Sequence, residues 1–210
     1  EVQLWKLEHL GLLAHVDDAT AALTRQQLID DLQTRLAQLD HIKRQPKYAK
    51  SPDDIEETLE ANATQLTRCD LLAMHVILGA LTEGHLTDAL LDQGQADRAD
   101  TTTEHGGLLR FDEHGAITAA LYPPQYHNTD FQYAVSDALT RDSVMGLAQY
   151  HFHFQQPYNE AIAGPGVGDL VHVKDTRCTG VVFTSMRGSK FDVDYYTPEG
   201  AVVDLGVWPR

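Results

Sequence analysis

The sequence contains little cysteine. Of its 210 residues only Cys69 and Cys178 are cysteines, they lie far apart in apolar surroundings, and neither belongs to a Cys-x-x-Cys pair. A small disulfide-stapled scaffold is therefore not indicated, because such scaffolds place several cysteines in a short chain. Two buried, free thiols in a cytoplasmic protein are a simpler prediction than a disulfide.

Long hydrophobic runs and an excess of positive charge are also missing. No apolar run approaches the roughly 18 residues that a membrane-spanning helix needs. The chain has 16 Lys and Arg residues against 31 Asp and Glu residues, a formal net charge of −15. A surface of that charge repels nucleic-acid phosphates and is unfavourable on anionic membranes. We therefore expect neither nucleic acid nor a membrane among the partners.

The first part of the chain, residues 1–95, has helical periodicity. Leucines recur at helical spacing, and the stretch 71–78 is apolar on nearly all sides, which predicts a buried helix. Ser51, Pro52, Asp53 and Asp54 form a helix-start signal. A last short helix is expected at 86–91, followed by a polar connector at 93–103. The spaced leucines are Leu4, Leu7, Leu10, Leu13, Leu23, Leu28, Leu32, Leu36 and Leu39. This half shows no cluster of catalytic residue types, so we predict that it contributes packing or binds a protein partner.

The second part, residues 100–210, has the residue patterns of β-strands. Two apolar runs flank the turn sequence Asp112-Glu113-His114-Gly115, which predicts a hairpin. A helix with Phe131 facing inward is expected at 131–141. Strands are predicted at 107–111, 116–121, 145–154, 180–185, 191–196 and 201–207. The sequence therefore predicts an α+β protein in which a helical region precedes a sheet domain.

Two histidines separated by one residue occur in the predicted strand 145–154. Alternate residues of a strand face the same side, so His151 and His153 can present two imidazoles to one point. Asp169 follows sixteen residues after His153. Two imidazoles, one carboxylate and a position left for water make the ligand count of a catalytic zinc site. Glu104 precedes a Gly-Gly-Leu-Leu strand and could accept the proton of an activated water.

In this order the residues resemble the JAMM (JAB/MPN) metallopeptidase family over about residues 100–210. The resemblance implies a mixed β-sheet with flanking helices, one Zn²⁺ held by His151, His153 and Asp169, and Glu104 as the catalytic residue. It implies hydrolysis of a peptide or isopeptide amide in a peptide or protein substrate. The chain departs from the family pattern at Phe154, where the family has Pro, and at Gly166, where it has a Ser that stabilises the oxyanion.

The loop between His153 and Asp169 is longer than the family's. We expect this loop to lie beside the metal and its Tyr158 and Asn159 to take part in substrate binding, one of them in place of the missing Ser. The loss of an oxyanion donor costs a factor of about 10² or more in turnover. Alternation directs Tyr150 away from the histidines, into the core. Asp192, Asp194 and Asp204 alternate with apolar residues, which predicts the polar face of a sheet edge.

Three alternatives arise from the sequence, and two of them, the cupin barrel and the inactive scaffold, remain open. A cupin barrel also uses His-x-His, although Glu160 lies further along than the cupin motif places its Glu. An amidohydrolase barrel needs about 250 residues, more than this chain has. A JAMM-like scaffold without activity, binding a protein partner through its helices, is the third alternative. The retention of all four polar positions favours the hydrolase over that scaffold.

Overall fold

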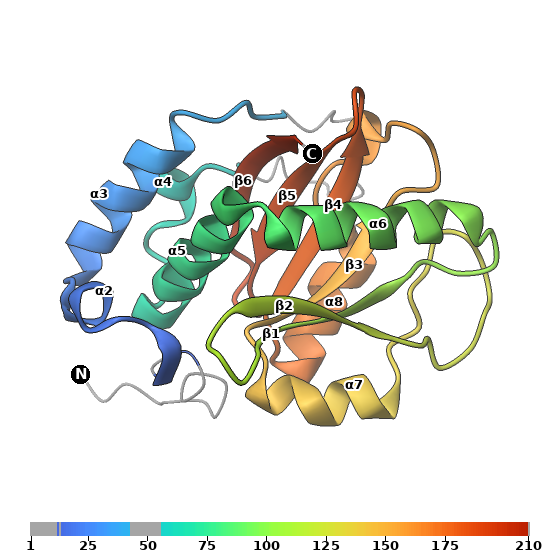
Figure 1. Ribbon diagram of the computed structural model, residues 1–210, viewed down its shortest axis with the longest axis horizontal. Helices are drawn as coiled ribbons and strands as arrows, with labels where there is room; N and C mark the ends of the chain where they lie inside the picture. Colours follow the sequence, from blue (N-terminus) through green and yellow to red (C-terminus); the bar gives the residue numbers. More distant parts are fainter. Residues whose placement is uncertain (1–11, 13, 43–55, 210) are drawn as a thin grey trace.

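The computed structural model describes residues 12, 14–42 and 56–209 (Figure 1). The predicted helix start at 51–54 and Leu4, Leu7, Leu10 and Leu13 lie outside the described residues. The helices are α2 (Asp18–Ala22), α3 (Arg25–Leu36), α4 (Leu59–Asn62), α5 (Arg68–Glu83), α6 (His85–Ala99), α7 (Asp137–Asp142) and α8 (Val167–Thr176). The strands are β1 (Gly106–Phe111), β2 (Ile117–Tyr122), β3 (Ala148–His153), β4 (Gly180–Met186), β5 (Lys190–Tyr196) and β6 (Val202–Pro209). Short 3-10 turns occur at Ser143–Met145 and Glu160–Ile162.

The helices α3 and α5 form where the leucine spacing predicts them. The hydroxyl of Thr24 accepts the backbone N–H of Gln27, and the side-chain oxygen of Gln27 accepts the backbone N–H of Thr24. This capping box starts α3. Helix α5 starts at the capping box of Thr67 with Asp70, and it ends at Gly84, whose φ of 86° suits glycine. No helix in the described part of the chain is long and apolar enough to cross a membrane.

Helix α6 is longer than the sequence predicts. The prediction of a polar connector from residue 93 is wrong, because α6 continues to Ala99. Gly94 on this helix packs against Phe154: a Cβ at Gly94 would lie 2.5 Å from the Phe154 ring. Asp97 is buried and accepts the backbone N–H of His105. The polar stretch therefore forms the last part of a helix, which packs through Gly94 and through the hydrogen-bonded side chain of Asp97.

One mixed sheet runs through the molecule in the order β2-β1-β3-β4-β5-β6. Neighbouring strands are antiparallel except β3 and β4, which are parallel and are joined through α8. The prediction of an α+β protein with helices first and a mixed sheet after them is confirmed. In the described residues the sheet is open, with β2 and β6 at its edges, which disagrees with a closed cupin barrel.

The helix predicted at 131–141 is only partly present. Its helical part, α7, starts at Asp137, where Ser136 caps it by accepting the N–H of Leu139. Phe131 lies outside the helix and is 72% exposed, so the prediction that it faces inward is wrong. The N-cap preference of Ser136 decides where the helix begins, in spite of the apolar residues that precede it.

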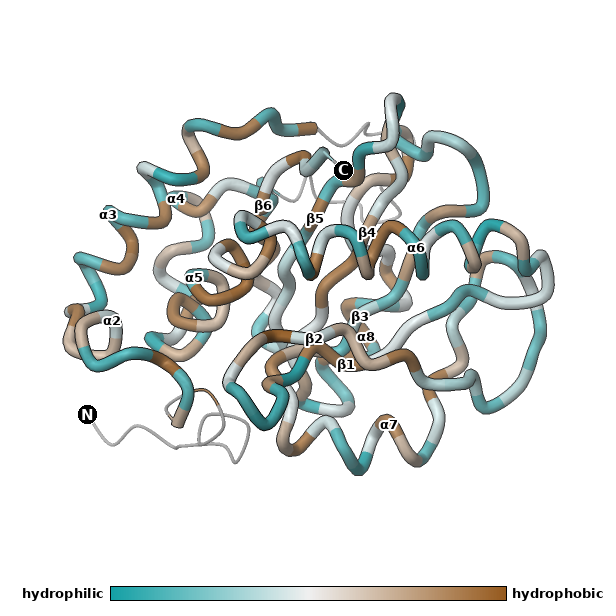
Figure 2. The backbone as a smooth tube through the Cα atoms, in the orientation of Figure 1, coloured by the Kyte–Doolittle hydropathy of each residue, from teal (hydrophilic) through white to brown (hydrophobic). Residues whose placement is uncertain are grey.

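The two faces of the sheet have different environments. Helices α3, α5 and α6 cover the face that carries Tyr150, Phe152 and Phe183, and together they form one hydrophobic core. In Figure 1, α6 crosses in front of the strands and α8 lies behind them. Figure 2 shows hydrophobic residues concentrated in α5 and the central strands, whereas α3 alternates hydrophobic and hydrophilic positions. The helical region and the sheet therefore share one core.

The second face of the sheet is largely polar. Helix α8 covers part of it, where Val173 packs on Val182, Tyr196 and Val202. The rest carries the two histidines of β3 and three aspartates, Asp192, Asp194 and Asp204. These aspartates are 1%, 1% and 8% exposed. They lie on one face of β5 and the edge strand β6, as predicted for the polar face of a sheet edge, but their burial was not predicted.

Candidate metal centre

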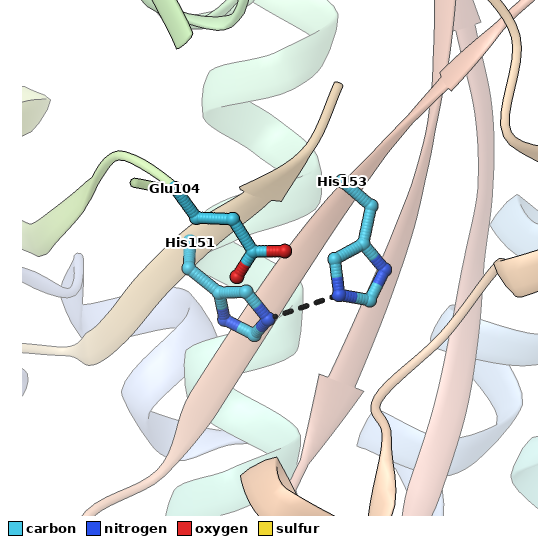
Figure 3. Close-up of side chains that lie close together, drawn as sticks. All are labelled: Glu104, His151 and His153. Atoms are coloured by element: carbon cyan, nitrogen blue, oxygen red, sulfur yellow. Dashed lines mark hydrogen bonds between the residues drawn. The ribbon is translucent and has the colours of Figure 1, made fainter. Parts of the chain in front are cut away.

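His151 and His153 lie at the carboxyl end of β3 and face the same side of the sheet. Their Nε2 atoms are 3.3 Å apart (Figure 3). Both side chains are buried. Tyr150, which precedes His151, and Phe152, which lies between the two histidines, point into the hydrophobic core on the other face. The strand alternation that the sequence indicates is therefore what brings the two imidazoles together.

Glu104 reaches the histidines from the segment just before β1. Strand β1 pairs antiparallel with β3, with Gly106 opposite His151. The N–H of Phe152 donates to the carbonyl of His105, so the pairing extends beyond β1 and places Glu104 opposite His153. One candidate ligand atom of each of Glu104, His151 and His153 lies within 4.8 Å of the others. Glu104 is 5% exposed.

Asp169 approaches His151 from the first turn of α8, outside the group of ligand atoms that Glu104, His151 and His153 form. Its Oδ1 lies 3.5 Å from Nε2 of His151. Its Oδ2 accepts the backbone N–H of Gly166, at 2.6 Å, which caps the helix. The cap fixes one carboxylate oxygen and leaves the other directed at the imidazole.

These residues fit a zinc ion by their separation and donor types. In a tetrahedral site with Zn–N bonds of about 2.0–2.1 Å, two ligand nitrogens lie roughly 3.3 Å apart. The Nε2 atoms of His151 and His153 have this separation. Nδ1 of His153 lies 3.1 Å from the carbonyl oxygen of Ile162. A proton on that Nδ1 leaves the lone pair of Nε2 directed at the site, which is the usual arrangement of a zinc-binding histidine.

The two carboxylates at the centre differ in their affinity for a proton. Burial raises the pKa of Asp169, but the charge and hydrogen bond of His151 outweigh it and hold that pKa well below its usual range. Burial dominates at Glu104 and, together with the neighbouring carboxylates, raises its pKa to about 8. Burial lowers the pKa of His151, but Asp169 and Glu104 raise it to about 9. Asp169 therefore stays ionised, whereas Glu104 can gain and lose a proton near neutral pH.

A cavity of about 560 Å³ borders this centre. Glu104, His151 and Asp169 form part of its wall. The opposite wall includes aromatic side chains, and two of them, Tyr126 and Phe131, are 51% and 72% exposed. The remaining lining residues are Gln125, Thr129, Gln132, Tyr133, Ala134, Val135, Thr140, Gln149, Tyr150, Gly168, His172 and Tyr196.

Tyr158 and Asn159 are not among the residues that line this cavity. Tyr158 is 50% exposed and stacks under the guanidinium of Arg187. Asn159 is buried and donates to the carbonyl of His153 and to Oε1 of Gln155, both at 2.9 Å. Of the six predicted site residues, the structure thus brings Glu104, His151 and His153 together, with Asp169 beside His151 and Asn159 bonded to the backbone of His153.

Three further residues near the centre, Gln155, His172 and Tyr196, are not among the predicted site residues. Gln155 is buried and donates its amide to Glu104, at 2.5 Å. Its place two residues after His153 continues the alternation of the histidines and could have identified it. His172 lies 2.8 Å from Gln149 on the cavity wall. Tyr196 is buried among apolar residues, which raises its pKa well above the usual value.

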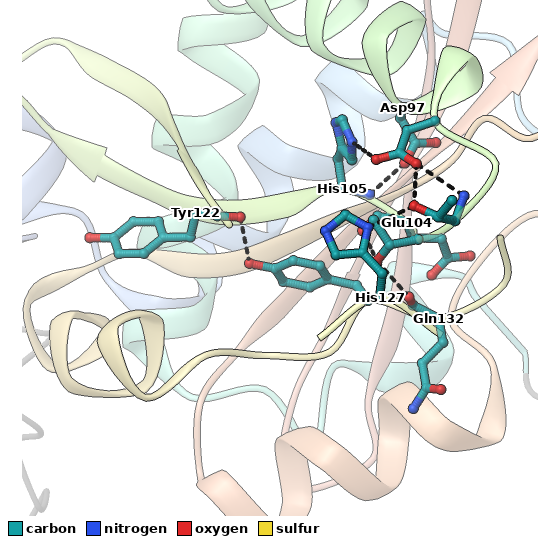
Figure 4. Close-up of polar contacts among 10 residues, drawn as sticks. Asp97, Glu104, His105, Tyr122, His127 and Gln132 are labelled. Carbon is teal, nitrogen blue, oxygen red and sulfur yellow. Dashed lines mark hydrogen bonds and ion pairs between the residues drawn. The ribbon is translucent and has the colours of Figure 1, made fainter. Parts of the chain in front are cut away.

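A second buried acid, Asp97, lies beside the segment that carries Glu104 (Figure 4). It accepts the N–H of His105, and the N–H of Glu104 donates to the carbonyl of Gln132 at 3.2 Å. Burial raises the pKa of Asp97 to about 7. Because its ordinary value is 3.8, the folded protein binds one more proton here than the unfolded chain between those two pH values.

This proton uptake predicts a pH-dependent stability. The free energy of unfolding should fall as pH rises from about 4 to about 7, because the folded state holds the extra proton. In Asp97→Asn this contribution disappears. From pH 4 to pH 8 the variant should gain on the order of 2–4 kcal/mol relative to the parent, since one pKa unit corresponds to about 1.36 kcal/mol. Urea denaturation of the metal-free proteins at both pH values measures this difference. Glu83→Gln, at an exposed helical position, is the control, and an equal gain there would contradict the prediction.

Comparisons of the chain with protein-family models, with curated proteins and with solved structures give no match.

Proposed function

We propose that this protein is a zinc-dependent hydrolase of the JAMM type that cleaves a peptide or isopeptide amide. One observation carries the proposal: the Nε2 atoms of His151 and His153 face each other at 3.3 Å, Glu104 has a carboxylate oxygen within 4.8 Å of a ligand nitrogen of each, and Oδ1 of Asp169 lies 3.5 Å from Nε2 of His151. Metal-assisted hydrolysis requires metal ligands and a group that transfers protons. Two imidazoles, one acid with a lowered pKa and one acid with a raised pKa meet this requirement.

Asp169 is the better ligand and Glu104 the better proton carrier. Asp169 remains ionised and directs one oxygen at His151. Glu104 keeps one oxygen on Gln155 and has a pKa of about 8, close to the value that suits a general base and acid near neutral pH. We therefore assign metal binding to His151, His153 and Asp169 and proton transfer to Glu104.

In this assignment zinc, when bound, polarises the water and the amide carbonyl. Glu104 takes the proton of the attacking water and passes it to the nitrogen of the leaving amine. Gln155 holds the carboxylate of Glu104 in position through its amide, and Asn159 holds Gln155. The burial of Glu104 and both histidines keeps bulk water from competing for that proton.

The cavity beside the centre suits a segment of polypeptide rather than a very small molecule. Its volume of about 560 Å³ accommodates several residues' side chains, and the exposed rings of Tyr126 and Phe131 offer apolar contact at its wall. A peptide or protein substrate is therefore the class that we propose.

The zinc content of the purified protein tests the proposal first. We expect one zinc per chain by elemental analysis after reconstitution and dialysis, and cleavage of peptide or lysine-isopeptide substrates that stops with chelation. Failure to bind zinc would contradict the metal centre itself. One zinc per chain without cleavage across both substrate types would favour an inactive scaffold that binds a protein partner.

Gly166 provides a test through gain of function. Its φ of −80° is open to any residue, and a Cβ there would meet only Oδ2 of Asp169, at 3.4 Å. Serine is also a good helix N-cap. Gly166→Ser restores the family's oxyanion donor, so turnover should rise by about 10²-fold at nearly unchanged stability.

The matched control is Gly168→Ser, where a Cβ has open space but no family serine occurs. Steady-state kinetics of both variants would compare their turnover. An equal response of the two variants would argue against an oxyanion role at position 166.

A further inference from the structure

A second cluster of acids lies on the same face of the sheet as the candidate metal centre, two strands away. Asp192 and Asp194 alternate on β5, and Asp204 lies opposite Asp194 on β6. One carboxylate oxygen of each lies within 4.8 Å of the others. All three residues are buried, so their charges are not solvated by bulk water.

Two described neighbours, His41 and Gly206, contact Asp204 in this cluster. His41 pairs with Asp204, with Nδ1 3.0 Å from Oδ2, and this contact raises the pKa of His41 to about 9. The N–H of Gly206 donates to the other oxygen of Asp204. Burial, and then the charges of Asp204 and Glu57, raise the pKa of Asp192 well above its usual value. The burial of Asp192 beside Asp204 thus disfavours the ionised form of Asp192.

An independent observation comes from Thr184 on β4. It lies directly opposite Asp192 in the β4–β5 register, so its side chain is on the same face as the cluster. Thr184 is 0% exposed, and its Oγ1 has no hydrogen-bond partner among the described residues. The same is true of Oδ1 of Asp192, in a residue that is 1% exposed. Buried oxygens of this kind are normally satisfied, by protein, water or an ion.

We propose that Asp192, Asp194, Asp204 and Thr184 form a binding site for a hard divalent cation, with calcium the best fit. All the candidate donor atoms are oxygens, the ligand type that calcium and magnesium prefer and that a structural zinc site seldom uses alone. Ligands on opposite sides of a calcium ion, at about 2.3–2.6 Å from it, are roughly 4.6–5.2 Å apart, so oxygens within 4.8 Å can share one ion. His41 orients Asp204 from outside.

Such an ion joins β4, β5 and β6 through their side chains, on the face opposite the hydrophobic core. It is separate from the candidate zinc centre in donor type and in residues. It therefore does not depend on the proposed hydrolase function.

Titration of the chelator-treated full chain with CaCl₂ and with MgCl₂ tests this site. We expect calorimetry to show one calcium per chain and the Tm to rise by about 5 °C or more at saturating calcium. His153→Ala should lose zinc but keep the calcium response. Asp192→Asn should lose the calcium response, whereas Asp175→Asn, at an exposed position of α8, should keep it.

Thr184→Val is the second variant, because it keeps the side-chain shape and removes only the hydroxyl. We expect it to fold and to weaken calcium binding by about 10-fold, since it loses one ligand. Absence of a calcium or magnesium response in the parent protein would overturn the proposal and leave a cluster that shares protons instead. A calcium response undiminished in both Asp192→Asn and Thr184→Val would place the ion elsewhere and overturn it as well.

Discussion

Glu104→Gln should abolish most of the hydrolytic activity while the protein keeps its zinc. Glutamine has nearly the same size, and its carbonyl can still accept the amide of Gln155, so the local structure should persist. It cannot take up a proton, and the loss of a general base lowers turnover by about 10²–10⁴-fold. Steady-state hydrolysis of the best peptide substrate, with zinc measured in the same samples, compares the variant with the parent.

Glu113→Gln is the control for this substitution, because Glu113 lies in the exposed turn between β1 and β2. It should match the parent in turnover and metal content. If Glu104→Gln loses zinc, the glutamate is a ligand and the assignment of Asp169 needs revision. If the variant remains fully active, Glu104 does not carry the proton.

His153→Ala should lose the zinc itself and, with it, all metal-dependent activity. The substitution removes one of three proposed protein ligands, and its Nε2 lies 3.3 Å from that of His151. Loss of an outer partner of a zinc ligand already weakens binding by about 10–100-fold, so loss of a ligand should exceed that. Competition with a chelator of known affinity measures the change.

His114→Ala is the matched histidine control, since the side chain of His114 is 81% exposed in a turn. It should bind one zinc as the parent does. Retention of parental zinc affinity in His153→Ala would show that the ion, if bound, is held by other residues. A joint loss in both variants would indicate unspecific binding by surface histidines.

The strands and the buried histidines could be predicted because period-two alternation is a local property of the sequence. Tyr150 faces the core and His151 the opposite side, as the pattern indicates. The approach of Glu104 to His153 is less local, because it depends on how β1 pairs with β3. The order of residues suggested it only through the family resemblance.

Other features could not be predicted because tertiary packing overrides the local pattern. The polar stretch after Gln93 forms the end of α6, since Asp97 finds a backbone partner in a buried place. The acids of β5 and β6 have the alternation of a solvated face, yet the segments that cover them come from elsewhere in the chain. Alternation after His153 indicates which way Gln155 faces, but its hydrogen bond to Glu104, 51 residues away in the sequence, depends on the tertiary fold.

The shared core limits the surface of α3 and α5 that is available for binding another protein. The inward leucines of α3 and α5 are already buried in the core that these helices share with the sheet, so they are not available to a docking partner. A fragment that begins near residue 100 would retain Glu104, His151, His153 and Asp169 but would uncover the rings of Tyr150 and Phe183. Exposed apolar strands of that kind tend to self-associate. The helices therefore cover apolar strands that would otherwise self-associate, and the part of the chain that carries the candidate metal centre shares its core with them.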